Sequence, residues 1–213
     1  MKAINKRTLI LTSIVILLPM LFGLALWNRL PEQMPTHFGF NGTVDGYSSR
    51  LFAVVGLPLF LLAMQLFCAV MLRADPKKQN ISEKMAQLVL WVCPAASLFV
   101  GLSMYLSALG FAINVSRFGM IFVGLLFIAI GNYLPKCRHN YTVGIRLPWT
   151  LDDEDNWNHT HRFAGYVWII AGVVTLLSVF LGHATVVWVA AIFVASLSPL
   201  VYSFVYAKKH GKI

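Results

Sequence analysis

The sequence predicts an all-α integral membrane protein that crosses the bilayer about six times. Three observations lead to this fold class: 58% of the 213 residues are hydrophobic, only 12% are charged, and the mean hydropathy is +0.72. A soluble domain cannot bury so much apolar surface, whereas a bilayer core about 30 Å thick needs roughly 20 apolar residues per crossing. Backbone polar groups in lipid need partners within the chain, so apolar runs of this length are expected to be helices.

Six apolar runs are long enough to span a bilayer. They cover residues 8–27, 51–72, 85–109, 118–134, 163–181 and 186–206. The first run follows Lys2, Lys6 and Arg7, as in a signal peptide, but it is long for a signal core, so we expect it to remain as the first helix. Prolines lie inside four of the runs and predict kinks. We expect a single membrane domain over residues 1–213, with a first pair of helices in 1–72.

The basic residues predict the orientation. If the N-terminus is cytoplasmic, fourteen Lys and Arg residues fall on the inner side and only Arg29, Arg50 and Arg117 fall on the outer side. This bias places both termini in the cytoplasm of a bacterial cell. Because the net charge of +9 flanks the spans, we expect the lipid bilayer as a partner and no direct binding of nucleic acid.

Two polar segments are long enough to carry a function. The outer one covers residues 28–50, where Asn41-Gly42 is typical of a tight hairpin turn. Within it, His37 is a candidate for pH sensing or metal binding, but no second metal ligand lies at a useful spacing, which favours a structural or surface role.

The inner polar segment covers residues 135–162. Pro135 and Pro148 interrupt helices, and Gly144 permits a tight bend. Thr150 with Asp153 resembles a capping box, so we expect a short helix to begin near Thr150. On it, Trp157, His161 and Gly165 share one face. The tryptophans in and beside the segment predict that it lies along the membrane interface before the fifth span, in an anchoring role.

Two weaker alternatives concern catalysis and transport. His159 and His161 lie close to the four acids of 152–155, a composition suited to a metal-dependent hydrolase at the membrane surface, with His37 as a further ligand. Neighbouring helical positions diverge by about 100°, so these groups do not converge on one ion. A small-solute transporter would need a polar cavity at mid-membrane, for which the sequence offers Gln65, Gln87 and Asn132. We expect no catalytic, metal or cofactor site.

The inner segment resembles the signature of the SdpI family, within residues 131–165. The residues that carry this resemblance are Gly131, Asn132, Asn140, Gly144, Arg146, Pro148, Trp149, Thr150, Trp157, Thr160, His161 and Arg162. Residues 30–46, with their Pro-Thr-His-Phe run, resemble a membrane domain of unknown function that often precedes this signature.

The resemblance implies a non-enzymatic immunity protein or receptor that protects a bacterium against a secreted antimicrobial peptide toxin. It implies in addition a signal to a cytoplasmic transcriptional repressor. We expect the toxin to meet the outer loop around Pro35, His37, Phe38, Gly42 and Asp45, and the signature segment to report its presence inward.

Overall fold

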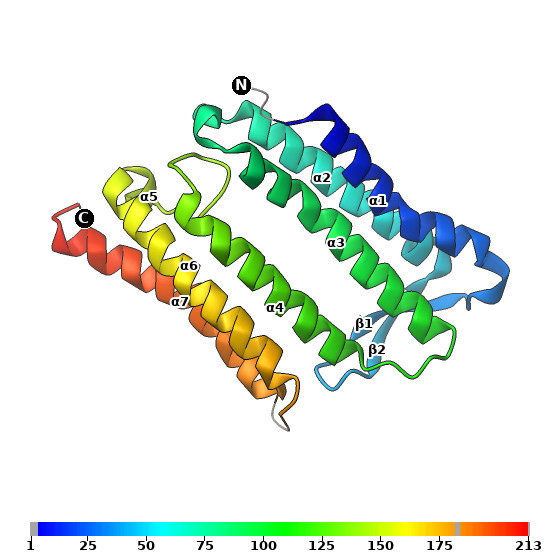
Figure 1. The fold of residues 1–213 in the computed structure, drawn as a ribbon. Helices are drawn as coiled ribbons and strands as arrows, with labels where there is room; N and C mark the ends of the chain where they lie inside the picture. Colours follow the sequence, from blue (N-terminus) through cyan, green and yellow to red (C-terminus); the bar gives the residue numbers. More distant parts are fainter. Residues whose placement is uncertain (1–3, 182–183, 213) are drawn as a thin grey trace. The chain divides into compact units, whose positions relative to one another are not determined.

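The computed structural model describes residues 4–181 and 184–212, and six of the helical segments in these ranges are long and apolar enough to cross a membrane (Figure 1). The helices are α1 (Lys6–Ala25), α2 (Leu57–Ala74), α3 (Glu83–Ala108), α4 (Val115–Tyr133), α5 (Pro148–Leu151), α6 (Glu154–Ser178) and α7 (Ala184–Lys209). A π-helical turn, Phe52–Gly56, extends α2 at its start, and short 3₁₀ turns occupy Trp27–Arg29, Lys78–Asn80 and Leu134–Lys136. The predicted class and number of spans are confirmed. Lys2 and the ends of the chain lie outside the described residues.

The chain forms two compact units. The hairpin unit contains the described residues up to Arg73 together with Ala86–Phe118, and the signature unit contains Ala74–Met85 and the described residues from Gly119 onward. The expectation of a single membrane domain stays a prediction.

The hairpin unit carries the only strands among the described residues, β1 (Gln33–Phe38) and β2 (Val44–Ser49). They pair antiparallel, with Gln33 opposite Ser49 and an irregularity between Pro35 and Phe38. In the turn, Gly42 has a φ of +83° and donates its N–H to the Gly39 carbonyl at 2.8 Å. The hairpin predicted from Asn41-Gly42 is therefore present, as a β element attached to an otherwise helical fold.

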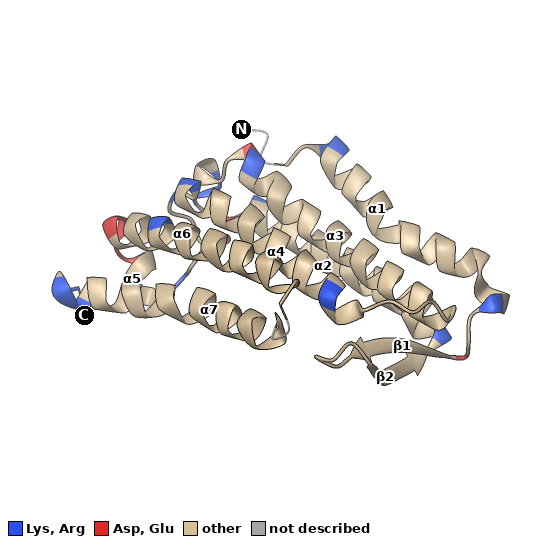
Figure 2. Cartoon of the chain, turned by 60° about the horizontal axis from the view of Figure 1, so that its bottom comes forward, with Lys and Arg blue, Asp and Glu red and all other residues tan. Residues whose placement is uncertain are grey.

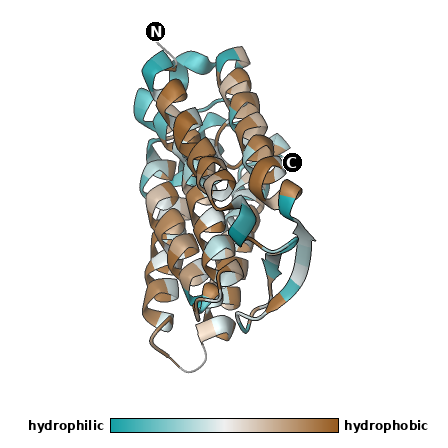
Figure 3. Cartoon of the chain, turned by 90° about the vertical axis from the view of Figure 1, so that its right-hand side faces the viewer, coloured by the Kyte–Doolittle hydropathy of each residue, from teal (hydrophilic) through white to brown (hydrophobic). Residues whose placement is uncertain are grey.

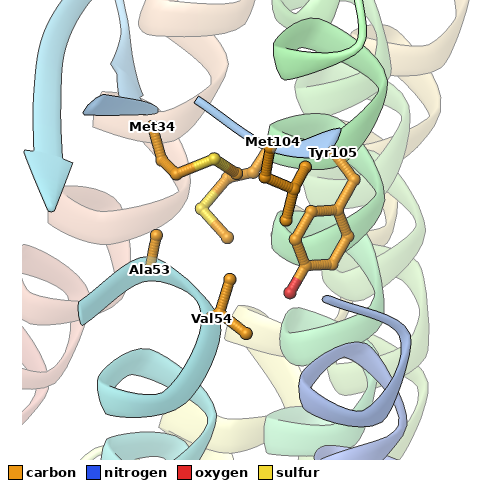
Figure 4. Close-up of a cluster of buried hydrophobic side chains, with 6 residues drawn as sticks. Met34, Ala53, Val54, Met104 and Tyr105 are labelled. Carbon is orange, nitrogen blue, oxygen red and sulfur yellow. The ribbon is translucent and has the colours of Figure 1, made fainter. Parts of the chain in front are cut away.

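A buried cluster joins this hairpin to its helices (Figure 4). The cluster contains Leu30, Met34, Ala53, Val54, Met104 and Tyr105. Two side chains of α3 also bind the backbone of α1. The Tyr105 hydroxyl donates to the Pro19 carbonyl and the Ser97 hydroxyl donates to the Ile16 carbonyl, both at 2.8 Å. A Cβ added at Gly101 would lie 2.6 Å from the Pro19 Cβ, so α1 and α3 touch closely at this proline. Polar donors from α3 thus reach backbone oxygens around the proline in α1.

Gln65, one of the polar residues considered for a transport cavity, is instead part of a contact between helices. It is 1% exposed, and its amide Nε2 donates to the hydroxyls of Thr12 and Ser13, both at 3.0 Å. Hydrogen bonds of this kind between membrane helices contribute about 0.6 to 2 kcal/mol each. In the structure Gln65 therefore holds α2 against α1.

In the signature unit, four glycines bring α4 and α6 together in antiparallel order. A Cβ added at Gly172 would lie 2.6 Å from the Gly124 carbonyl oxygen, and one added at Gly165 would lie 2.9 Å from the Gly131 carbonyl oxygen. The two glycines of each helix are seven residues apart, which is about two helical turns, so both contacts lie on one face. Small residues allow such close approach of backbones in a membrane, where dispersion contacts replace the hydrophobic effect between helices.

Helix α7 packs along α6. The Trp168 indole N–H donates to the Ala195 carbonyl at 2.9 Å, and the Phe127 ring lies 5.0 Å from the Trp168 ring. Trp168 thus fills the space between α4, α6 and α7.

The surfaces of the helices suit a lipid environment. Charged residues gather near helix ends and in the connections (Figure 2), and the middle parts of the helices are mostly apolar (Figure 3). Large apolar side chains such as Leu21, Phe67 and Phe193 are about 60% exposed, which in water would be costly over so many positions. The chain is a multi-pass protein of the cell membrane.

The helix that carries Trp157 and His161 begins at Glu154, a few residues after the predicted start near Thr150, and continues without a break into the fifth span. Asp153 is the N-cap of α6 and accepts from the Asp155 N–H at 3.2 Å. Thr150 lies in the single turn α5, where its hydroxyl oxygen accepts from the Leu147 N–H. From Glu154 the helix runs to Ser178, and Trp157 and His161 are buried in its first turns. Asp153 takes the capping position with an extended backbone, whereas the Thr150 hydroxyl is already bound to Ile145 and Leu147.

We predict that Gly172→Leu weakens the packing of α6 on α4. The new side chain meets the Gly124 carbonyl, which is backbone and yields only if a helix moves, at a cost of about 2 to 3 kcal/mol. Unfolding in detergent mixtures of increasing dodecyl sulfate content, followed by circular dichroism, measures the loss. Ala190→Leu on the exposed side of α7 is the matched control and should unfold like the original chain. Equal midpoints for both variants would contradict the glycine contact.

Candidate functional site

The segment 137–147, which we call the signature loop, is closed around His161 of α6. The His161 ring accepts from the Ile145 N–H through Nε2 at 2.9 Å and donates from Nδ1 to the Trp157 carbonyl at 2.7 Å. The Trp157 indole N–H in turn donates to the Cys137 carbonyl at 2.7 Å. Both ends of the loop are therefore tied to one helical turn. Trp157 and His161 therefore share one face of α6, as their spacing predicted.

Aromatic packing fills the space between this turn and the loop. The rings of Trp157 and His161 stack with centroids 4.0 Å apart, and the His139 ring meets Trp157 edge-on at 5.1 Å. Gly144 crosses over the stack with a φ of +116°, and a Cβ there would lie 3.1 Å from the Trp157 ring. Only glycine combines this backbone conformation with so little space.

Asn140 shapes the interior of the loop. It is 1% exposed, and its side-chain oxygen accepts from the N–H groups of Thr142 and Val143 at 2.9 and 2.7 Å. Its amide Nδ2 donates to the Arg138 carbonyl at 2.8 Å. An Asn side chain of this kind supplies the acceptor that a regular helix or sheet would otherwise provide.

A second anchor comes from the connection between α2 and α3. The Asp75 carboxylate is 3% exposed and accepts from the Tyr141 N–H at 2.9 Å and the Thr142 hydroxyl at 2.6 Å. Hydrogen bonds to a charged group contribute about 1.5 to 3 kcal/mol. Asp75 is thus a main determinant of the loop conformation.

Two further side chains of this connection bind His139. The Lys77 ammonium donates to Nδ1 of the His139 ring at 2.6 Å, and the Asn80 amide donates to the His139 carbonyl at 2.7 Å. Sequence reasoning missed Asp75, Lys77 and Asn80. They lie more than fifty residues away along the chain, and an Asp-Pro-Lys-Lys run indicates only a turn.

The far side of the site is fastened to α7. The Trp149 indole N–H donates to the Ser203 hydroxyl and the Asn156 amide donates to the Ser203 carbonyl, both at 3.0 Å. The Thr160 hydroxyl donates to the Asn156 side-chain oxygen at 2.9 Å, which orients that amide. Thr150 and Thr160 of the signature are therefore buried groups that position their neighbours.

The remaining signature residues lie at the surface or in helix contacts. Arg146 and Arg162 are exposed, and Arg146 donates to the Tyr141 carbonyl at 2.8 Å. Asn132 is exposed and accepts from Lys136, Pro148 begins α5, and Gly131 belongs to the contact with α6. Arg138 is exposed as well, and we call these three exposed arginines the basic rim.

The histidines do not converge on a metal. His159 stacks on Tyr206 at 5.0 Å, whereas His161 uses both ring nitrogens on backbone groups of the loop. Within residues 4–181 and 184–212, no group of three or more His, Cys, Asp and Glu side chains is placed to hold a metal ion. The arrangement therefore lends no support to a hydrolase that uses His37, His159 and His161.

Cys137 begins the signature loop, and its thiol is buried. Burial raises the pKa of Cys137 to about 11, and the weaker opposing effect is a hydrogen bond from Asn140. A thiol with this pKa is about one thousandth thiolate at pH 8, so it reacts slowly while the loop stays closed.

The hairpin holds the residues predicted to meet a toxin. The His37 ring donates to the Asp45 carboxylate at 2.5 Å, and both side chains are exposed. Pro35 is buried and Phe38 is half-buried, so these two shape the hairpin more than its surface. A Cβ at Gly46 would lie 2.8 Å from the His37 Cβ, so Gly46 makes room for this ring.

The tip of the hairpin is held by the start of α4. The Ser116 hydroxyl donates to the Phe40 carbonyl at 2.8 Å, and a Cβ at Gly42 would lie 3.2 Å from the Asn114 side-chain oxygen. The hairpin is therefore held at both its base and its tip. That these residues recognise a partner stays a prediction.

Two segments of the chain match models of described protein families. Residues 136–203 match the SdpI/YfhL protein family, and residues 14–62 match a domain of unknown function (DUF1648). The chain is 26% identical over 206 residues to the immunity protein SdpI of Bacillus subtilis (strain 168), covering 94% of this chain and 96% of that protein. No solved structure matches. The expected resemblance is confirmed in both halves.

We predict that Gly144→Ala opens the signature loop. Alanine is strained at the positive φ by about 1 kcal/mol, and its Cβ in addition displaces the His161 ring, which it meets first, and the Trp157 ring. In a chain that also carries Cys68→Ala and Cys93→Ala, alkylation of Cys137 at pH 8 should become several-fold faster as the thiol loses its buried position.

Gly211→Ala is the matched control, because Gly211 also has a positive φ but nothing lies within 4 Å of an added Cβ. It should leave the labelling rate of Cys137 unchanged. Identical rates for the two variants would show that Gly144 does not hold the loop closed.

Proposed function

We propose that this chain, whose residues 136–203 match the SdpI/YfhL protein family, is a membrane immunity protein that protects its cell against a secreted antimicrobial peptide. One observation carries the proposal. The similarity to the immunity protein SdpI extends over 94% of the chain, so it includes both the hairpin and the signature loop.

The geometry of the signature loop suits recognition better than catalysis. Asn140, Thr150 and His161 direct their polar atoms at backbone groups of the same loop. A general acid or base needs a polar atom that faces the substrate. Among the signature residues Asn132, Arg146, Pro148 and Arg162 remain exposed, and the two arginines suit binding of a partner surface.

We propose further that the hairpin faces outward and the signature loop faces the cytoplasm. The contacts in each unit support an alternating path. Asp75 meets the signature loop after the chain has crossed through α3 and α4, and Ser116 meets the hairpin after α2 and α3. A chain that crosses a membrane twice returns to the side where it started. Asp75 and the signature loop therefore lie on one side, and the hairpin and Ser116 lie together on one side as well. The excess of Lys and Arg on the side of Asp75 favours that side as the inner one.

In this orientation the exposed face of the hairpin is the first contact for an external peptide. His37, Asp45 and Tyr47 are exposed on it, and Phe40 is 65% exposed at its tip. Aromatic rings beside a hydrogen-bonded polar pair suit an amphipathic peptide.

The basic rim of Arg138, Arg146 and Arg162 is the corresponding inner surface. A cytoplasmic transcriptional repressor with an acidic patch is the partner that we propose for it, on grounds of charge complementarity. The binding of a repressor presupposes the immunity function, but the immunity function does not require a repressor.

The orientation predicts which introduced cysteines are labelled from outside. In a chain without its native cysteines, Thr43→Cys in the hairpin turn should react with a membrane-impermeant maleimide on intact cells. Gln79→Cys, which is equally exposed in the connection between α2 and α3, should react only after the cells are permeabilised. The opposite pattern would invert the proposed arrangement.

The immunity function predicts survival of a sensitive strain. Expression of the chain should raise the tolerated concentration of a secreted membrane-active peptide, and the double variant with His37→Ala and Asp45→Ala should lose about tenfold of that tolerance, the effect of about 1.4 kcal/mol of contact free energy. Growth in a peptide dilution series measures both.

Glu32→Gln is the matched control, because Glu32 is an exposed acid at the base of the same hairpin. It should protect like the original chain at equal membrane abundance. An original chain that gives no protection against any such peptide would refute immunity, whereas full protection by the double variant would refute only the role of the hairpin pair.

A further inference from the structure

A groove with two chemically different parts runs along α7 where it meets α6. Its larger part has a volume of about 630 Å³ and is almost wholly apolar. The side chains that line it include Phe163, Phe193, Leu197, Val201, Tyr202 and Val205. Tyr202 stacks on Phe163 of α6 at 4.5 Å, which forms a firm aromatic wall.

The smaller part adjoins the first through the shared residues Tyr202 and Val205. It has a volume of about 450 Å³ and is completed by His159, Tyr206, Lys209 and His210. The Tyr206 ring is stacked between two imidazoles, with His159 at 5.0 Å and His210 at 4.2 Å. The described residues that line this part include no carboxylate, and Lys209 brings a positive charge; the nearest acids, Asp153 and Asp155, lie outside the lining but close enough to interact with Tyr206.

The position of the two parts along the helix suits a lipid. Phe193 and Val205 are twelve residues apart, which is about 18 Å of helix and close to half of a hydrocarbon core about 30 Å thick. The polar part lies at the end of α7, beside the exposed Lys208 and Lys209 in its last turn. The apolar part of the groove therefore matches the acyl-chain region of one leaflet, and the polar part matches its headgroup region.

We propose that this groove is a binding site for one anionic phospholipid. An acyl chain lies along Phe193, Leu197 and Val201, and the phosphate accepts hydrogen bonds from Lys209 and from the imidazoles of His159 and His210. The stacked rings hold the imidazoles in place, so little side-chain freedom is lost on binding. Basic groups next to an apolar surface at the membrane boundary favour anionic over neutral lipids.

This site is separate from the proposed immunity function. Its polar end uses His159, which the signature loop leaves free, and α6 presents His161 to the loop and His159 to α7. A lipid in the groove contacts α6 and α7 together and so stabilises the pairing that supports Trp149 and Asn156.

The experiment is native mass spectrometry of the full chain in detergent with added phosphatidylglycerol or phosphatidylcholine. We expect one phosphatidylglycerol to remain bound, with clear preference over phosphatidylcholine. Lys209→Ala should lower its occupancy about fivefold, the effect of one basic group at a membrane surface. Lys84→Ala, an exposed lysine in the first turn of α3 and outside the groove, should leave the occupancy unchanged.

A second pair of variants tests the apolar part. Val201→Trp fills the groove and should also lower the occupancy, whereas Ile170→Trp on the exposed side of α6 should not. Glycerol phosphate, which carries a headgroup without acyl chains, should not displace the lipid at equal concentration. Circular dichroism checks that each variant is folded.

Equal retention of the two lipids, or equal occupancy in Lys209→Ala and Lys84→Ala, would overturn the proposal. Displacement by glycerol phosphate would overturn it as well, since the site would then take a free phosphate and not a lipid. Because none of these measurements uses a toxin, their outcome does not depend on immunity.

Discussion

Each polar backbone group within or beside lipid needs a partner supplied by the chain, and this constraint organises the structure. Along the spans, the hydrogen bonds within each helix supply these partners. Around Pro19, donors from α3 reach the neighbouring carbonyls. In the signature loop, which has no regular ladder of hydrogen bonds, Asn140, Asp75 and His161 act as acceptors for five N–H and O–H groups. A loop next to a membrane becomes rigid in this way without being a helix or a strand.

The same helix that spans the bilayer carries the signature side chains, which connects packing with function. Gly165 lies one turn after His161, and it touches Gly131 of α4. A shift of α6 against α4 would therefore also move the histidine that holds Ile145 and the tryptophan that holds Cys137. Close glycine contacts restrict α6 to few positions, because backbone atoms that touch cannot adjust by changing rotamers. Such a helix is suited to pass on a discrete change between the two sides of a membrane.

The agreement between sequence and structure is greatest where the pattern is local. Apolar runs predicted the spans to within a few residues, except that α6 begins nine residues before the run from Phe163, since polar residues fill its first turns. Asn41-Gly42 predicted the hairpin, and a spacing of four predicted the shared face of Trp157 and His161. Asp75, Lys77 and Ser203 were missed, because their role depends on contacts between segments far apart in the chain.

By itself the sequence determined the fold class, the six spans, the hairpin turn and the family resemblance, since each follows from composition or from neighbours a few residues apart. Only the tertiary structure decided what the signature residues do. It buries His161 and Trp157 as supports of a loop, leaves His159 to a groove on α7, and recruits Asp75 from another connection. The physical reason is that a polar side chain near a membrane takes the partner that packing brings to it. Packing depends on which helices come together, and the local sequence does not determine that.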